Sequence, residues 1–283
     1  MKWKLGCSMI VTCLLLFSAL HSIEASNYSN ARIHWGFKKS VDHESPSAGN
    51  HLDKLLAEYN SVYLGDPSKK EIYLTFDNGY ENGYTSPILD VLKKKKVPAT
   101  FFVTGHYLKS QPDLIKRMDA EGHIIGNHSW HHPDLTKVSD VRLKNELELV
   151  REEFEKLTGK KGMQYLRAPR GIFSERTLAL SGQLGYTNIF WSLAFVDWKI
   201  DQQQGWMHSY NQVMKQIHPG SILLMHTVSK DNSIAMEKII TDLQAQGYVF
   251  KSLDDLMMKR VMPHQWIFGY DDVKEMDSVD VLS

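Results

Sequence analysis

The sequence predicts an α/β protein built on a parallel sheet that is closed, or nearly closed, into a barrel. From residue 71 onward, short apolar runs alternate with helical patterns along the chain. Short loops separate them, and repeated strand–helix units of this kind are typical of parallel sheets. In addition, polar residues suited to acid–base chemistry or metal binding follow several of the apolar runs, where α/β folds usually carry their chemistry. With 283 residues and a hydrophobic content of 42%, the chain can bury a sizeable core.

The first 25 residues are expected to be a secretory signal peptide rather than part of the fold. Two of the first four residues are lysines, and an apolar run follows over residues 5–20. This run is too short and too poorly flanked for a typical membrane-spanning helix, and Ala25 ends a plausible cleavage site. An uncleaved membrane anchor is the alternative. Both cysteines lie in this segment, so the mature chain is expected to have neither disulfides nor thiolate metal sites.

The rest of the chain is expected to divide into three segments. Residues 26–70 form a polar lead-in that packs on the barrel and contains one short helix, residues 71–260 form the main domain, and residues 261–283 form a C-terminal tail. Basic and acidic residues are equal in number, at 33 each. No overall charge therefore draws the protein toward nucleic acid.

The main domain is expected to begin with a strand at residues 71–76, where apolar residues alternate with others. The strand is expected to stop at Asp77-Asn78-Gly79, because glycine tolerates the backbone angles of a sharp turn. Taken alone, this turn is more typical of a hairpin than of an active site. The polar residues that follow later strands favour the active site.

The helices and strands that follow have clear boundary signals. A Ser-Pro pair at residues 86–87 begins one helix, and residues 111–121 form another. Ser139 caps a long helix with apolar residues at spacings of three and four, and Gly159 ends it. Further strands are expected at residues 99–104, 123–126, 164–168, 187–193, 221–227 and 248–250.

Two histidines, His128 and His132, lie four residues apart and share one face if this segment is helical. Neutral imidazole is the commonest metal ligand, and zinc is commonly held by two histidines and a carboxylate with one open position. Alone, such a pair is more often found at the surface. Together with Asp77 at a strand end, and with Pro133 next to it, the pair indicates a metal site.

Three further polar residues adjoin strand-like runs. Arg167 follows a short strand, and its planar, permanently charged group orients a carboxylate well. Asp197 follows the run at residues 189–196 and can orient or tune a histidine. His226 ends the apolar run at residues 222–225. Each has an ordinary structural interpretation on its own, but together with Asp77 and the histidine pair they predict one shared active site.

Five segments, in order, resemble the motifs of the polysaccharide deacetylase family, carbohydrate esterase family 4. They are Thr75-Phe-Asp-Asn-Gly79, His128-Ser-Trp-His-His132, Arg167-Ala-Pro-Arg-Gly171, Asp197-Trp198 and Leu224-Met-His226. The resemblance covers about residues 71–258. It implies a distorted (β/α) barrel with parallel strands and a metal-dependent active site.

The resemblance also implies roles for the residues in these motifs. Asp77 corresponds to the catalytic base and Arg167 to the residue that orients it. His226 corresponds to the acid that protonates the leaving amine, and Asp197 keeps it protonated. The metal ligands correspond to His128, His132 and Asn78, and the substrate-binding positions to Trp198 and to Arg170, near which a backbone N–H holds the oxyanion.

A narrower resemblance, to the muramic acid deacetylases of spore-forming bacteria, rests on three stretches. They are Trp35-Gly-Phe-Lys, residues 75–83 and residues 191–199. Those enzymes act on spore cortex peptidoglycan and lead to muramic δ-lactam. The resemblance implies de-N-acetylation of N-acetylmuramic acid by a monomer secreted across the cytoplasmic membrane, into the forespore intermembrane space or the cell wall.

Asn78 departs from the broader family, which usually has a second aspartate here as a metal ligand. An amide oxygen can still coordinate a cation but brings no negative charge, so we expect a zinc-like divalent metal to bind more weakly. The narrower group shares this asparagine, which favours an active enzyme. The alternatives are a chitin, xylan or N-acetylglucosamine deacetylase, and a secreted glycan-binding protein with a decayed site.

Overall fold

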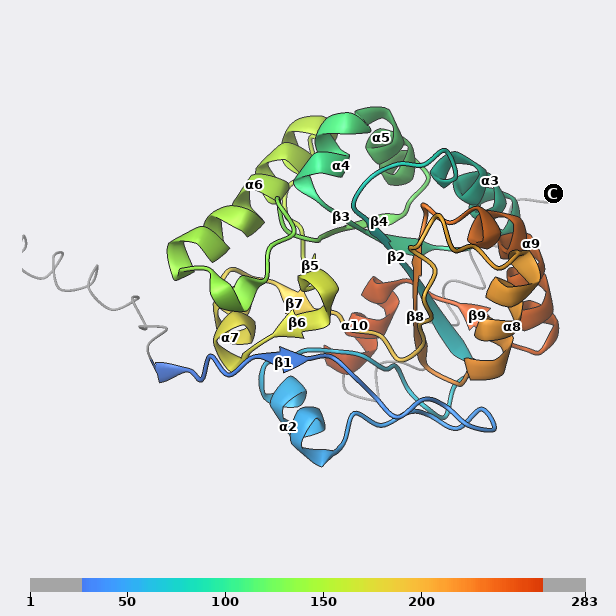
Figure 1. The fold of residues 1–283 in the computed structure, drawn as a ribbon, viewed down its shortest axis with the longest axis horizontal. Coiled ribbons are helices and arrows are strands. Elements are labelled where there is room, and N and C mark those ends of the chain that lie inside the picture. The colour runs from blue at the N-terminus through green and yellow to red at the C-terminus, as the bar shows by residue number, and fades with distance from the viewer. Residues whose placement is uncertain (1–26, 262–283) are drawn as a thin grey trace, which may run out of the picture.

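A curved sheet of parallel strands forms the centre of the protein, and helices surround its outer side (Figure 1). The computed structural model describes residues 27–261, so the predicted signal peptide and C-terminal tail lie outside the described residues. The strand order is β7-β5-β4-β3-β2-β8, and β9 pairs with β2. All neighbouring strands of this sheet are parallel, which confirms the predicted fold class.

The central strand β2 runs from Glu71 to Asn78, and all eight of its residues are buried. It pairs with β3 on one side and with β8 on the other, so that Asp77 lies opposite both Phe102 and His226. The other strands are β3 Ala99–Val103, β4 Ile124–Asn127, β5 Tyr165–Leu166, β7 Thr187–Asn188, β8 Ser221–His226 and β9 Val249–Phe250. Because the carboxyl ends of parallel strands meet at one edge of a sheet, this register brings Asp77 and His226 side by side.

The predicted helices occur in the predicted order, and two helices that were not predicted are also present, one before Pro112 and one after Phe250. They are α2 Asn50–Glu58, α3 Thr85–Lys95, α4 Gly105–Ser110, α5 Pro112–Ala120, α6 Asp140–Thr158, α7 Glu175–Gln183, α8 Trp206–Gln216, α9 Lys230–Ala245 and α10 Leu253–Val261. The predicted ends of α6 are confirmed, because Ser139 accepts a hydrogen bond from the Arg142 N–H and Gly159 adopts a left-handed conformation with φ 72°. The short helix α4 was not predicted. Between residues 27 and 261, no helix is both long enough and apolar enough to cross a bilayer.

The core lies between the sheet and its outer helices, and aromatic side chains fill much of it. Phe76 of β2 stacks on Phe101 of β3 with ring centroids 5.0 Å apart. On β4, a Cβ at Gly126 would lie 2.6 Å from the Phe102 ring, so only glycine allows this close packing. The strands that carry the polar residues are therefore fixed from behind by a close-packed core.

The N-terminal segment crosses from one edge of the sheet to the other. Its strand β1, Ile33–His34, pairs antiparallel with β6, Ile172–Phe173. Further along, Val62 forms a bridge with Ile189, just after β7, and Leu64 forms a bridge with Ser221 of β8. The predicted boundary at residue 70 stays a prediction.

Two predicted strands are much shorter in the structure, and the one predicted at residues 164–168 contains only Tyr165 and Leu166. The run at residues 187–193 was expected to be a strand, but β7 contains only Thr187 and Asn188. Beyond them the chain makes isolated bridges, Val62 with Ile189 and Leu193 with Leu223, and continues without regular structure to the start of α8. The prediction was wrong there because the apolar residues of this run are buried against several elements rather than against one continuous strand partner.

Candidate active site

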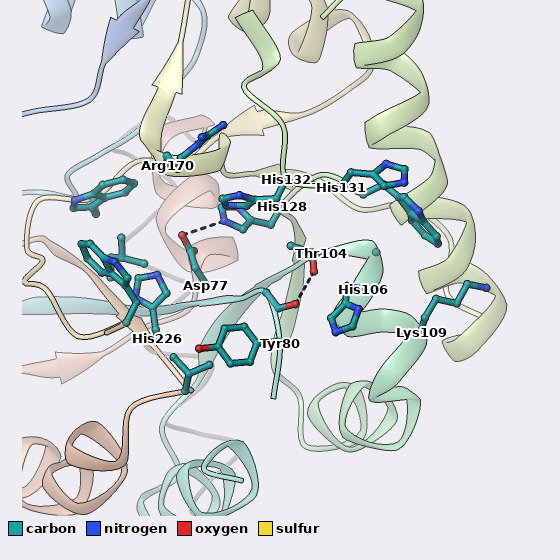
Figure 2. Close-up of a pocket in the computed structure, with 17 residues that line it drawn as sticks. Asp77, Tyr80, Thr104, His106, Lys109, His128, His131, His132, Arg170 and His226 are labelled. Carbon is teal, nitrogen blue, oxygen red and sulfur yellow. Dashed lines mark hydrogen bonds and ion pairs between the residues drawn. The ribbon is translucent and has the colours of Figure 1, made fainter. Parts of the chain in front are cut away.

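A pocket of about 1050 Å³ opens at the carboxyl ends of the strands (Figure 2). Six of the nine predicted site residues line it, namely Asp77, His128, His132, Arg170, Trp198 and His226. The other three, Asn78, Arg167 and Asp197, are buried behind this wall. Figure 2 shows Asp77 between His128 and His226, so residues from three strand ends converge on one point.

Arg167 fixes Asp77 from below the pocket. Its Nη1 lies 2.8 Å from Asp77 Oδ1, its Nε donates to the Ile189 carbonyl at 3.0 Å, and its side chain is fully buried. Burial alone would raise the pKa of Asp77, but the neighbouring His128 and Arg167 outweigh it and hold this pKa below its usual value. Arg167 is the permanently charged member of this group, and its guanidinium binds the Asp77 carboxylate directly.

The two histidines approach each other through an irregular loop rather than a helix. The helical arrangement considered for His128 and His132 is wrong, because Ser129 and His132 have φ values of 64° and 57°. The rings nevertheless lie 4.9 Å apart between centroids. The loop is held locally, since the Ser129 N–H donates to the Asn127 side chain at 2.8 Å.

Both imidazoles are neutral at pH 7. Burial lowers the pKa of His128, and burial together with the neighbouring His128 lowers the pKa of His132 to about 4. The Nδ1 of His128 lies 2.8 Å from the Arg167 carbonyl oxygen, to which it donates as the protonated nitrogen. Nε2 therefore has a free lone pair, and it lies 3.5 Å from Asp77 Oδ2. An N–H to carbonyl contact of this kind is the usual support of a metal-binding histidine.

Asn78 is buried behind the pocket wall and is engaged on one side. Its Nδ2 donates to Thr227 Oγ1 at 2.8 Å, and its buried Oδ1 has no hydrogen-bond partner among the described residues. Within residues 27–261, no three His, Cys, Asp or Glu side chains form a group that could hold a metal ion. Two neutral imidazoles and an unpartnered amide oxygen fit a divalent cation by donor type, but they bring no negative charge.

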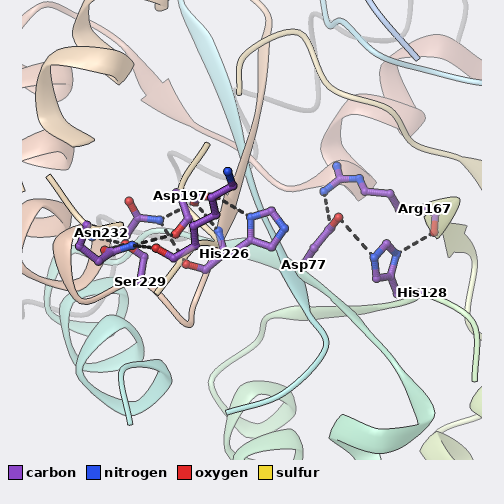
Figure 3. A network of polar contacts seen from close by, with 9 residues as sticks. Asp77, His128, Arg167, Asp197, His226, Ser229 and Asn232 are labelled. Atoms are coloured by element: carbon purple, nitrogen blue, oxygen red, sulfur yellow. Dashed lines mark hydrogen bonds and ion pairs between the residues drawn. The ribbon is translucent and has the colours of Figure 1, made fainter. Parts of the chain in front are cut away.

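Asp197 and His226 form a second pair (Figure 3). His226 Nδ1 lies 2.7 Å from Asp197 Oδ1, and the His226 backbone N–H donates to Asp197 Oδ2 at 2.8 Å. Burial would lower the pKa of His226, but Asp197 outweighs burial and raises it. Trp198 lies beside the pair, with its ring 5.4 Å from the His226 ring.

Two functional residues escaped the sequence reasoning. Trp191 lines the pocket, although only its place in the narrower resemblance pointed to it. Asn232 donates to Asp197 Oδ2 at 2.6 Å. Its signal in the sequence is the run Ser229-Lys-Asp-Asn232, which begins three residues after His226, because serine at this place predicts the start of a helix.

The pocket therefore presents two groups of opposite charge on adjacent strands. Asp77 is a carboxyl group whose pKa is held down by the neighbouring His128 and Arg167, whereas His226 is an imidazole whose pKa Asp197 raises. A carboxyl group with a lowered pKa beside an imidazole with a raised pKa is typical of an acid–base pair. Such a pair can take a proton from water and give one to a leaving group.

The fold and this site define a family, and comparison with known proteins identifies it. The chain belongs to the polysaccharide deacetylase family, whose sequence model matches residues 64–189. It is 55% identical over 262 residues to the peptidoglycan-N-acetylmuramic acid deacetylase PdaA of Bacillus subtilis (strain 168), covering 93% of this chain and 98% of that protein. These findings confirm the family resemblance.

Two further comparisons agree. A solved structure of Bacillus subtilis PdaA, described as a family 4 carbohydrate esterase, matches with a TM-score of 0.81 and 57% identity, over 82% of this chain and 99% of that one. A chitooligosaccharide deacetylase of Bradyrhizobium is 34% identical over 207 residues, covering 68% of this chain and 93% of that protein. The similarity is thus much greater to the muramic acid enzyme than to the chitooligosaccharide enzyme.

Proposed function

We propose that this protein hydrolyses the N-acetyl group of N-acetylmuramic acid residues in peptidoglycan glycan strands, releasing acetate and a free amine. The observation that carries the proposal is the placement of the Asp77–Arg167 and Asp197–His226 pairs on adjacent strands of one pocket. The choice of sugar is supported by 55% identity to a muramic acid deacetylase against 34% to a chitooligosaccharide deacetylase.

In this proposal Asp77 acts as the base. Asp77 takes the proton from the water that attacks the acetyl carbonyl carbon. Arg167 helps to keep Asp77 ionised and oriented by binding its Oδ1, and leaves the Oδ2 of Asp77 unused. A backbone N–H near Arg170 holds the oxyanion of the tetrahedral intermediate, by resemblance to the family. Proton transfer of this kind typically contributes 10²–10⁴-fold.

His226 acts as the acid. When the bond between the carbonyl carbon and the sugar nitrogen breaks, the nitrogen must leave as a neutral amine, because an amine anion is a very poor leaving group. His226 donates this proton, and Asp197 holds its ring by Nδ1 so that the opposite nitrogen carries the proton to the pocket.

A divalent cation would be held by His128 and His132, with the Asn78 amide oxygen as a further donor. When bound, it would polarise the acetyl carbonyl and lower the pKa of a bound water. The charge of such an ion would be poorly compensated by these three neutral donors. We therefore propose that this site binds the metal more weakly than a site with an aspartate at position 78.

The pocket walls suit a muramic acid residue. Trp191 and Trp198 offer aromatic surface to sugar rings, and the exposed Arg170 adds a guanidinium to the lining of the same pocket. N-acetylmuramic acid carries a lactyl carboxylate once its stem peptide is removed, whereas N-acetylglucosamine carries none. An arginine pairs well with a carboxylate, so Arg170 favours the muramic sugar.

The product explains the biological role that we propose. The freed 2-amine lies beside the lactyl carboxylate, and the two can close to a six-membered δ-lactam, as in spore cortex. We propose that residues 1–25 direct secretion across the cytoplasmic membrane and that the protein acts as a monomer in the forespore intermembrane space or the cell wall.

The direct test is acetate release from peptide-free cortex glycan, with chitooligosaccharides as the comparison substrate. Faster release from the muramic glycan is expected, and the products carry free amine only on muramic residues. Release from chitooligosaccharides alone would favour the N-acetylglucosamine deacetylase, and no release from either would favour the glycan-binding protein. In the bacterium, a strain without this protein should make cortex without δ-lactam.

A further inference from the structure

We propose that Asn232 is a positioning residue that holds Asp197 against His226 and so aims the acid at the leaving nitrogen. This inference rests on the proposed function, because it concerns the step that protonates the leaving group. Asn232 does not line the pocket, so it acts through the Asp197–His226 pair rather than by touching the substrate.

The contacts of Asn232 connect both members of the pair from behind (Figure 3). Its Nδ2 donates to Asp197 Oδ2 at 2.6 Å and to the His226 backbone carbonyl at 3.1 Å, and the residue is fully buried. One amide group therefore connects the loop that carries Asp197 to the end of the strand that carries His226. If it is removed, the His226 N–H is the only other hydrogen-bond donor to Asp197 Oδ2 among residues 27–261.

Asp197 needs this support because the loop that carries it has no regular secondary structure to hold it in place. From residue 194 to the start of α8 the chain forms no helix and no strand. Two large apolar side chains of the loop point largely into solvent, since Val196 is 55% exposed and Trp198 is 47% exposed. Phe195 packs into the core, and beyond it the part of the loop around Asp197 is held by side-chain hydrogen bonds.

These hydrogen bonds come from one place, the first turn of α9. Ser229 donates to Gln203 Oε1 at 2.7 Å, and Gln203 Nε2 in turn donates to the Asp197 carbonyl at 3.2 Å. Asp231 accepts from the Gly205 N–H at 2.7 Å. The first turn of α9 therefore holds the loop at Asp197, Gln203 and Gly205. Among Ser229, Asp231 and Asn232, it is Asn232 that reaches the Asp197 carboxylate.

The surroundings of Asn232 indicate that its amide group serves the contact with Asp197. Its N–H donates to Ser229 Oγ at 3.1 Å, which fixes the residue on the rigid end of a 16-residue helix. Its Oδ1 is buried without a hydrogen-bond partner among the described residues. A buried unpaired carbonyl is unfavourable, so an apolar side chain of similar shape would suit this position better if only packing mattered.

The test separates the acid step from the rest of the reaction by the leaving group. An amine must be protonated to leave, whereas the phenolate of 4-nitrophenyl acetate leaves without a proton. Asn232→Leu keeps the size of the side chain and removes both donors. We expect acetate release from the glycan to fall about 10–10²-fold, because small displacements of a catalytic group have costs of this size. Hydrolysis of 4-nitrophenyl acetate should stay within about threefold of wild type.

Asn232→Ala provides a second variant that cannot overpack the site, and Ser139→Ala provides a control that loses a helix cap outside the lining of the pocket. The control should change both rates equally. An equal change in both rates for the Asn232 variants, unchanged glycan hydrolysis, or failure of both variants to fold would overturn the positioning role.

The proposed function is tested separately, by whether the wild-type protein releases acetate from the muramic glycan. If chitooligosaccharide proves to be the substrate instead, the same two variants are compared on that amide. The ratio of amide to ester hydrolysis then still decides the role of Asn232.

Discussion

Replacing Arg167 by methionine should disable the base while leaving every group that faces the pocket in place. In the wild-type protein, burial opposes the ionisation of Asp77 and the Arg167 guanidinium, at 2.8 Å, counteracts it. Without the guanidinium, burial is opposed only by His128 and His226, so the pKa of Asp77 should rise. A protonated Asp77 cannot accept a proton from water, so acetate release at neutral pH should fall by at least about 10².

The same change should lower stability by an amount that depends on pH. Removing one partner of a buried ion pair costs about 3–5 kcal/mol, which corresponds to a fall in Tm of about 6–20 °C for a domain of this size. The lowered pKa of Asp77 means that its pair stabilises the wild-type fold above the unfolded pKa of 3.8 and loses this contribution as the pH falls. The difference in Tm between wild type and variant should therefore shrink in acid.

The assay is kcat/KM for acetate release as a function of pH, with Tm measured in parallel. The acidic limb should move to higher pH in Arg167→Met, because the base now ionises later. The matched control is Arg151→Met, since Arg151 donates to the Tyr186 hydroxyl and the Leu184 carbonyl. It should lose stability without moving the acidic limb. An unchanged limb and rate in Arg167→Met would refute the reasoning.

Three further predictions follow from the same geometry. Asp77→Asn and His226→Ala should each reduce acetate release by at least about 10² while the far-ultraviolet circular dichroism stays that of the folded protein; near-normal turnover in either would contradict its role. Because Asp197 raises the pKa of His226, the acid form persists above pH 6.5, and the alkaline limb of kcat should lie above that value and move down in Asp197→Asn. The Asn78→Asp variant should bind a divalent cation more tightly than the wild-type protein, as measured by calorimetry that starts from chelator-treated protein. The Thr227 hydroxyl, which accepts from Asn78, should then turn to donate to the new carboxylate. Equal affinities in the two proteins would remove Asn78 from the site.

The sequence was most informative where one strand is buried on both sides. The strands at β2 and β8 were predicted within two residues of their observed ends, because their apolar runs are continuous and stop at turn or polar residues. The caps of α6 were predicted for an equally local reason, since serine and glycine act on the backbone beside them. Local signals of this kind can be recognised without knowledge of the rest of the fold.

The site was harder to predict because its contacts are distant in sequence. Asp77 and Arg167 are 90 residues apart, and Asp197 and Asn232 are 35 residues apart. The motifs named Asp77, Arg167 and Asp197, but no periodicity reveals which buried amide meets which carboxylate. The irregular path between His128 and His132 was missed for a related reason, because Trp130 and His131 of this loop form hydrogen bonds with the distant Glu146 of α6.

The bridges made by Val62 and Leu64 have a consequence for how the protein avoids self-association. Strands β7 and β8 end the sheet on either side, and unpaired strand edges are templates on which other chains can add. The N-terminal segment occupies part of both, through Ile189 after β7 and Ser221 on β8. A chain that begins at residue 66 would leave these backbone groups uncovered. Its first failure should be edge-to-edge aggregation, detectable by light scattering, rather than loss of the pocket.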